Sequence, residues 1–180
     1  MHTLAASIIL WGGLVAASAQ AAGGASSGTC EVRLSDARSG RELTRLSLPA
    51  QDPQIQIAFE HSVLGTTVID RYRFTPAPVL VEEEFEGEGY GLPSTAGPGE
   101  RLETHGTRKR LVLWRSVDPL VVRALREQRM RVLLPQGELL LSSLGASTVL
   151  FEAEHCAVQA RRCHQPEAWM RAPWIESSPK

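Results

Sequence analysis

Apolar and polar residues alternate along two neighbouring segments of the chain, 54–61 and 67–74. In the first segment the apolar series ends at His61, and in the second Asp70 stands within the apolar series. Alternation with a period of two is typical of strands that bury one face. A short connection that contains a glycine separates the two segments, so the pattern predicts a β-hairpin.

The predicted hairpin places His61 directly opposite Asp70. A two-residue turn within Leu64–Thr67 and a four-residue loop between Val63 and Val68 both give this register. A charge on an apolar face is unfavourable unless it has a partner, so the presence of His61 and Asp70 at these positions needs an explanation. Either the pair binds a ligand, or it is a structural His–carboxylate pair that fixes the strand register. The sequence leaves both interpretations open.

In the next segment, Val79–Phe85, the odd positions Val79, Val81 and Phe85 are apolar, with Glu83 among them. Matching the inward faces across the turn at 76–78 predicts that Asp70 lies near Glu83. His61, Asp70 and Glu83 would then form one polar row, which could hold a divalent cation or accept a basic or hydrogen-bonding ligand. The glutamates of this stretch also form a local acidic patch, which is expected to be a solvated face. They are Glu82, Glu83, Glu84, Glu86 and Glu88.

Ser62 follows His61 directly, which suggests a hydrolase with Ser62 as nucleophile, His61 as base and Asp70 as the residue that orients the base. Neighbours in a strand point to opposite faces, however, and no Gly-x-Ser-x-Gly elbow occurs in the chain. We therefore assign no catalytic residue and keep the hydrolase as an alternative. The residues of the predicted ligand-binding site are His61, Ser62, Asp70, Glu83, Gly89 and Gly91.

Gly89 and Gly91 belong to a glycine-rich stretch, Gly87–Pro93, that follows the acidic segment. The stretch lacks the Lys-Ser or Lys-Thr pair of a phosphate-binding loop, and no helix start is evident after it. We expect a tight turn beside the acidic strand and then loop structure as far as Gly106. A calcium-loop motif is also absent from the sequence, so we expect no cofactor.

Further strands are predicted where apolar runs are bounded by turn residues. Residues 118–126 are ambiguous, because Asp before Pro can start a helix whereas the paired valines favour a strand. We expect an all-β fold, a small antiparallel barrel or sandwich of about eight strands that can include one short helix, most simply arranged as a meander. The further strands are expected at 30–34, 42–48, 110–114, 130–135, 138–142 and 148–152.

The first 22 residues carry no Lys, Arg, Asp or Glu and are apolar from Leu4 to Ala17. They predict a secretory signal peptide with cleavage after Ala19 or Ala21, and an uncleaved anchor is the alternative. We therefore expect a periplasmic or secreted protein with no membrane span after cleavage. The chain is expected to consist of a signal peptide (1–22), a linker (23–29), a β domain (30–153) and a C-terminal tail (154–180).

Three cysteines, Cys30, Cys156 and Cys163, remain after processing, and an oxidising compartment favours a disulfide. Cys156 can pair with Cys163 or with Cys30, and the sequence does not separate the two pairings. Together with His155 and His164, the last two cysteines could also form a metal site. This interpretation is weaker, because exported thiols oxidise more often than they bind zinc.

The formal net charge of −1 over 180 residues argues against nucleic acid as a partner. Binding to nucleic acid requires a concentrated basic face, which a nearly neutral chain does not provide. The short basic run Arg108–Arg110 precedes a predicted strand and is interpreted as a solvated strand end.

Three motifs together resemble a known bacterial family. They are Phe-Glu-His-Ser-Val at 59–63, Thr-Val-Ile-Asp at 67–70 and the segment 85–93 ending in Gly-Tyr-Gly-Leu-Pro, in a chain whose first strand opens with a cysteine. The family is the small exported domain of unknown function that is often encoded beside TAXI-type TRAP transporters. These transporters are tripartite uptake systems that depend on a solute-binding protein. The resemblance covers roughly residues 30–152.

The resemblance carries no established activity, so it implies a context and not a mechanism. It implies a non-catalytic accessory or ligand-binding module near such a transporter, with TRAP transporter components or a small solute as partners. In that family pattern the position of Asp70 is commonly Glu, and the position of Tyr90 is commonly Ala. A purely structural partner-binding domain is the further alternative.

Overall fold

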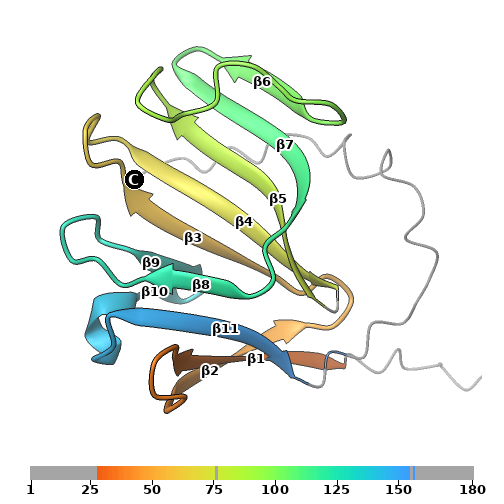
Figure 1. Ribbon diagram of the computed structural model, residues 1–180. Helices are drawn as coiled ribbons and strands as arrows, with labels where there is room; N and C mark the ends of the chain where they lie inside the picture. Colours follow the sequence, from red (N-terminus) through yellow and green to blue (C-terminus); the bar gives the residue numbers. More distant parts are fainter. Residues whose placement is uncertain (1–27, 76, 155, 157–180) are drawn as a thin grey trace, which may run out of the picture.

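The computed structural model describes residues 28–75, 77–154 and 156 (Figure 1). The predicted signal peptide (1–22), most of the predicted linker, His155, and the tail beyond Cys156 with Cys163 and His164 lie outside the described residues. Within the described ranges, no helix is long and apolar enough to cross a membrane.

The described chain folds into two antiparallel β-sheets of four and seven strands (Figure 1). The small sheet has the spatial order β2 (Glu42–Pro49), β1 (Thr29–Asp36), β11 (Thr148–Glu154) and β8 (Leu120–Arg123). The large sheet has the order β10 (Gly137–Leu140), β9 (Arg131–Leu134), β3 (Gln54–Glu60), β4 (Thr67–Thr75), β5 (Ala77–Glu86), β7 (Arg108–Ser116) and β6 (Arg101–His105). A short 3-10 helix, η1 (Leu141–Leu144), connects β10 to β11.

The all-β prediction is confirmed, and of the two expected architectures the structure is an open sandwich and not a closed barrel. The expected meander is wrong, because the chain crosses between the sheets after β2, β7, β8 and η1. The ambiguous segment forms strand β8, in which Leu120 and Val122 are buried on one face. The polar edge strand β6 lies where the sequence predicts a loop, because an edge strand needs little apolar surface.

The apolar core lies between the inner faces of the two sheets. Its largest side chains, Phe74 and Phe85 from the large sheet and Phe151 from the small sheet, are fully buried. Burying a large apolar side chain contributes about 1.5–3 kcal/mol relative to leaving it exposed. The alternating apolar residues of β3 and β4 face this core, as their period of two predicts.

The outer face of the large sheet is covered by ion pairs between neighbouring strands. Glu82 on β5 binds Arg110 on β7 at 2.5 Å and Arg71 on β4 at 3.4 Å. Arg108 on β7 binds Glu84 on β5 at 3.3 Å. These glutamates point away from the core, as predicted. The expectation of a solvated acidic face is wrong for Glu82, which is only 7% exposed and is neutralised by arginines.

A disulfide joins Cys30 in β1 to Cys156, which lies just beyond the end of β11. Of the two pairings that the sequence leaves open, this is therefore the one that the structure contains. The two cysteines are 126 positions apart in the sequence. The bond thus fastens the first strand of the described chain to the last, which lie side by side in the small sheet.

We predict that Cys156→Ser lowers the free energy of unfolding by about 3–5 kcal/mol, because a cross-link that closes a long loop restricts the unfolded chain. Urea unfolding under oxidising conditions measures the loss, and a reductant should produce the same loss in the wild-type protein. Cys163→Ser is the matched control, since it leaves the Cys30–Cys156 bond intact. Equal stability of the Cys156→Ser and Cys163→Ser variants would contradict the prediction.

Candidate functional site

The hairpin that carries His61 and Asp70 closes earlier than the sequence predicts. The backbone N–H of His61 donates to the carbonyl of Thr66 at 2.8 Å, and the N–H of Gly65 donates to the carbonyl of His61 at 2.8 Å. Asp70 is therefore paired with Ile57, and the predicted pairing of His61 with Asp70 is wrong. His61 lies four positions after Ile57, which corresponds to roughly 13 Å along a strand.

The imidazole ring of His61 explains why the loop closes there. Its Nδ1 atom accepts hydrogen bonds from the backbone N–H groups of Val63 and Leu64 at 3.3 and 3.2 Å. Such side-chain bonds to nearby backbone groups stabilise a tight loop. The Nε2 atom lies 3.2 Å from the carbonyl oxygen of Tyr90 and must donate to it, because a carbonyl only accepts. His61 therefore joins the two loops through hydrogen bonds of both ring nitrogens.

The second of these loops contains the predicted site residues Gly89 and Gly91. Three consecutive residues, Gly89, Tyr90 and Gly91, have positive φ angles of 75°, 54° and 94°. The two glycines adopt this region without strain, whereas it is uncommon for tyrosine. The resulting turn directs the Tyr90 carbonyl at His61 and leaves the Tyr90 side chain 70% exposed. The structure thus brings His61 together with the glycine loop, and Ser62 lies exposed beside them.

Asp70 and Glu83 form a separate group in the middle of the large sheet. They lie directly opposite each other on β4 and β5, as the sequence predicts. The register shifts by one residue next to this pair, between Arg71 and Tyr72, because Val81 is an extra residue in β5. This β-bulge leaves Asp70 and Glu83 in the predicted register and displaces only the part of the hairpin nearer to the turn.

Tyr72 completes the group with Asp70 and Glu83, and these three residues are called the carboxyl cluster. The phenol of Tyr72 donates a hydrogen bond to Oδ2 of Asp70 at 3.1 Å. Oδ1 of Asp70 is shielded from solvent and has no hydrogen-bond partner among the described residues. Tyr72 stands two residues after Asp70 on the same face of the strand, so the period-2 pattern contains the signal that could have identified it.

Burial shifts the protonation of the carboxyl cluster. Desolvation, reinforced by the charge of Glu83, raises the pKa of Asp70 to about 7, and the hydrogen bond from Tyr72 opposes the shift. Desolvation also raises the pKa of Glu83, with Arg115 lowering this pKa and Glu100 raising it. The cluster can therefore retain a proton near neutral pH or bind a cation that replaces this proton.

Two charged residues that the sequence does not connect with the site flank Glu83. Arg115 on β7 binds the carboxylate of Glu100 at 3.0 Å. The same carboxylate accepts the backbone N–H of Gly97 at 2.9 Å, which fixes the end of the loop that precedes β6. These contacts bring a guanidinium and a third carboxylate close to the carboxyl cluster. No spacing rule links positions 83, 100 and 115, because their proximity depends on tertiary folding.

The predicted metal sites do not assemble. Within residues 28–75, 77–154 and 156, no group of three His, Cys, Asp or Glu side chains is placed to hold a metal ion. His61 is not in one row with the two carboxyls, so the expected three-residue row is wrong. Cys156 is bonded to Cys30, and the other members of the alternative cysteine–histidine site lie outside the described ranges.

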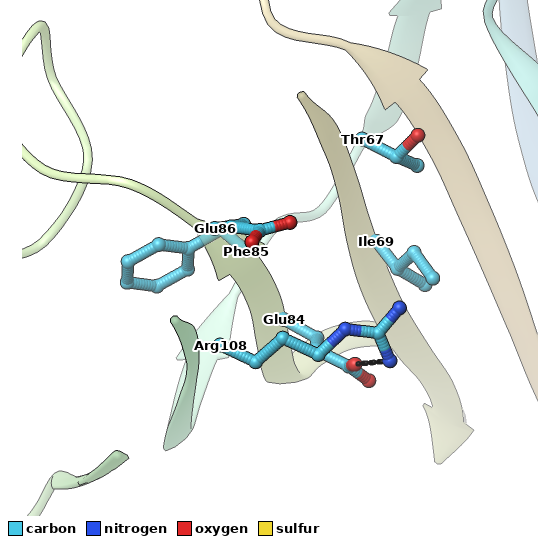
Figure 2. A pocket seen from close by; sticks show the side chains of 6 residues that line it. All are labelled: Thr67, Ile69, Glu84, Phe85, Glu86 and Arg108. Atoms are coloured by element: carbon cyan, nitrogen blue, oxygen red, sulfur yellow. Dashed lines mark hydrogen bonds and ion pairs between the residues drawn. The ribbon is translucent and has the colours of Figure 1, made fainter. Parts of the chain in front are cut away.

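A hollow of about 240 Å³ lies on the opposite, outer face of the large sheet. Figure 2 shows the six residues that line it, with the ring of Phe85 turned away from the ion pair between Arg108 and Glu84. The hollow is thus separated from the carboxyl cluster by the sheet itself. Its six lining residues are Thr67, Ile69, Glu84, Phe85, Glu86 and Arg108.

Comparison with protein families gives one match. A family model described as a domain of unknown function (DUF1850) matches residues 55–141. This span begins in β3 and ends at the start of η1, so it contains the His61 loops and the carboxyl cluster and omits β1, β2 and β11. Comparison with curated proteins and with solved structures finds no match. The expected similarity to a family of unknown function is therefore supported.

We predict that Asp70→Asn changes how stability depends on pH. Because the pKa of Asp70 is about 7 in the folded protein and 3.8 is the ordinary value, the folded state holds this proton more tightly than the unfolded chain does. The contribution to stability is complete below about pH 4 and is lost as the pH rises towards 7. The amide of the substituted asparagine does not ionise, so the variant should exceed the wild type by about 1–3 kcal/mol at pH 8.

Urea unfolding between pH 4 and 8 measures this difference. Asp36→Asn is the control, because Asp36 is only partly buried and hydrogen bonds from Arg38 and Ser39 lower its pKa. That variant should keep the wild-type decline of stability between pH 4 and 7. A decline of the same size in Asp70→Asn would show that Asp70 does not bind this proton.

We predict that His61→Ala opens the hairpin loop without unfolding the sheet. The amide protons of Val63 and Leu64 lose their acceptor and should exchange with solvent at least tenfold faster, a loss of roughly 1.4 kcal/mol of protection. His61→Asn retains an acceptor near the Nδ1 position and should protect the two amides, while it cannot reach the Tyr90 carbonyl. Hydrogen exchange followed by NMR distinguishes the variants, and unchanged exchange in His61→Ala would refute the role of the ring.

Proposed function

We propose that this protein is an exported, non-catalytic accessory module of a TRAP-type solute uptake system, and that its carboxyl cluster binds the cationic group of a small solute. Export rests on the apolar segment 1–22, and the association with a transporter rests on the resemblance of the three motifs. The family match over residues 55–141 is consistent with that resemblance and adds no partner.

The observation that carries the proposal is the unpartnered carboxyl oxygen of Asp70. Its Oδ1 atom is shielded from water and has no hydrogen-bond partner in the described part of the chain. An unsatisfied buried acceptor costs on the order of 1–3 kcal/mol, and an N–H group of a ligand would remove this cost. Glu83 lies directly opposite and supplies a second carboxyl group to the same ligand.

The charges around the carboxyl cluster favour a cation over an anion. Arg115 is the cation near Glu83, but its guanidinium is already bound to Glu100. When Asp70 is ionised, the two carboxylates of the cluster therefore have one guanidinium nearby, and Glu100 already binds it. An ammonium or guanidinium group offers several N–H donors and a positive charge, which match such a site. The proposed ligand class is thus a primary amine, an amidine or an amino acid bound through its amino group.

The contacts of His61 do not favour the alternative hydrolase. A catalytic base needs a free ring nitrogen that faces the hydroxyl of the nucleophile. In His61, Nδ1 already accepts two backbone N–H groups and Nε2 is bonded to the Tyr90 carbonyl. Proton transfer from Ser62 would require the loop to open first. We therefore do not propose Ser62 as a nucleophile.

A second candidate function, binding of a protein partner, is favoured by the two loops that His61 joins. Val63 is 60% exposed and Tyr90 is 70% exposed, one on each loop. The side chain of Leu64 also packs against Gly87, where an added Cβ would lie 3.0 Å from Leu64 Cδ1. An aromatic and an aliphatic side chain held outward on fixed loops are typical anchors of protein interfaces.

The proposed ligand site is tested by a thermal-shift screen at pH 7 with amines, guanidines, amino acids, dicarboxylates and divalent cations. We expect amines or amino acids to raise the melting temperature, because a ligand that binds only the folded state stabilises it. Asp70→Asn and Glu83→Gln should each abolish the increase. The matched control is Glu84→Gln, which removes a carboxylate from the outer face of the same strand and should keep the response.

The possible outcomes separate the two candidate functions. A response to amines that survives in both Asp70→Asn and Glu83→Gln places the ligand elsewhere and rejects the carboxyl cluster. No response to any compound also rejects it and leaves the loops that present Val63 and Tyr90 as the functional surface. Dicarboxylates that bind better than amines would contradict the charge argument.

A further inference from the structure

The connection between β8 and β9 is a second exposed surface, distant in sequence from the carboxyl cluster. In Figure 1 it forms the loop that extends beyond the ends of these two strands. It is held by backbone hydrogen bonds, from Arg129 to the carbonyl of Arg126 at 3.0 Å and from Glu60 to the carbonyl of Gln128 at 2.7 Å. Arg129 has a positive φ of 47°, which turns the chain into β9. The loop therefore has a defined shape.

The side chains of this segment combine positive charge with apolar surface. Val121 and Leu125 are 44% and 38% exposed. Arg123, Arg126 and Arg129 are also exposed, and none of them forms an ion pair with another described residue. These five residues are called the basic–apolar edge. Its single acidic neighbour within the loop is Glu127, so the segment 121–129 has a formal charge of +2 (three arginines minus one glutamate).

Arginines elsewhere on the strands differ from these three, because they form ion pairs with acidic residues. Arg131, at the start of β9, is bound by Glu60 and Glu138 at 3.2 and 3.3 Å. Arg33 in the small sheet is likewise bound by two glutamates. On the sheet faces, then, arginines are neutralised by neighbours, whereas the three exposed arginines of the basic–apolar edge form no ion pair within the described part of the chain. Such a surface is complementary to an anionic partner.

We propose that the basic–apolar edge docks on the surface of an anionic lipid bilayer. The guanidinium groups would bind the phosphates of the headgroups, while Val121 and Leu125 enter the boundary between headgroups and acyl chains. Basic side chains mixed with aliphatic ones favour a membrane surface over an acidic protein, because a lipid surface adapts to the loop and requires no complementary pocket.

Docking of this kind would place the protein on the bilayer and not across it. The protein would lie at the bilayer surface through one edge of the sandwich, with its carboxyl cluster between the sheets. This inference does not depend on ligand binding by the carboxyl cluster. It rests only on the five residues of the basic–apolar edge.

Vesicle sedimentation with the mature protein tests the proposal, using phosphatidylcholine vesicles with and without phosphatidylglycerol. We expect binding only to the anionic vesicles, and weakening when the ionic strength rises from about 0.1 M to about 0.5 M. The double variant Arg126→Gln/Arg129→Gln should bind about 30-fold more weakly, which is roughly fivefold for each arginine. The matched control is Arg38→Gln/Arg41→Gln, which removes two exposed arginines from the turn between β1 and β2 and should bind like the wild type.

A third variant, Leu125→Ser, isolates the apolar contribution and should leave a weaker interaction that is more sensitive to salt. Circular dichroism and the melting temperature of every variant establish that the sandwich is folded. Equal losses in the two double variants would show that only net charge matters and would overturn the proposal. Absence of binding to anionic vesicles, including the case in which the protein binds polyglutamate instead, would also overturn it and would indicate an acidic protein as the partner.

Discussion

The structure depends on the exclusion of water from the layer between its two sheets. Buried residues of β1, β3, β4, β5 and β11 create this layer, and the disulfide between Cys30 and Cys156 ties its first and last strands together. The same layer receives Asp70 and Glu83, because they occupy inward positions in their strands. Their raised pKa values are the physical consequence of this placement.

The candidate site therefore consists of two parts with different tasks. His61 is fully engaged in joining two loops, and its contacts explain the shape of both without any ligand. The carboxyl cluster is incomplete in comparison, since one oxygen of Asp70 has no partner in the described structure. A polar group with a structural role has all its hydrogen bonds within the protein, whereas a group that binds a ligand keeps an atom free for it. This contrast is the reason for assigning the ligand to Asp70 and Glu83.

The period of two along the chain was sufficient to predict most of the strands, the buried faces of β3 and β4, and the contact between Asp70 and Glu83. It was insufficient for the turn at His61, because the register of a hairpin depends on loop hydrogen bonds that a hydrophobic pattern does not encode. The bulge at Val81 and the edge strand β6 were unpredictable for related reasons. A bulge changes no residue type, and an edge strand such as Arg101–His105 has a largely polar sequence.

The period of two also does not predict the two-sheet topology, because each crossing between the sheets is decided by tertiary packing. Glu100 and Arg115 reach Glu83 only through that packing. The central claim concerns Asp70, and carbon-13 NMR of its side-chain carboxyl group tests this claim most directly. We expect a pKa of about 7 for Asp70 in the free protein and a lower value in the presence of a saturating amine. An ordinary pKa near 3.8, or a raised value that no amine changes, would contradict it.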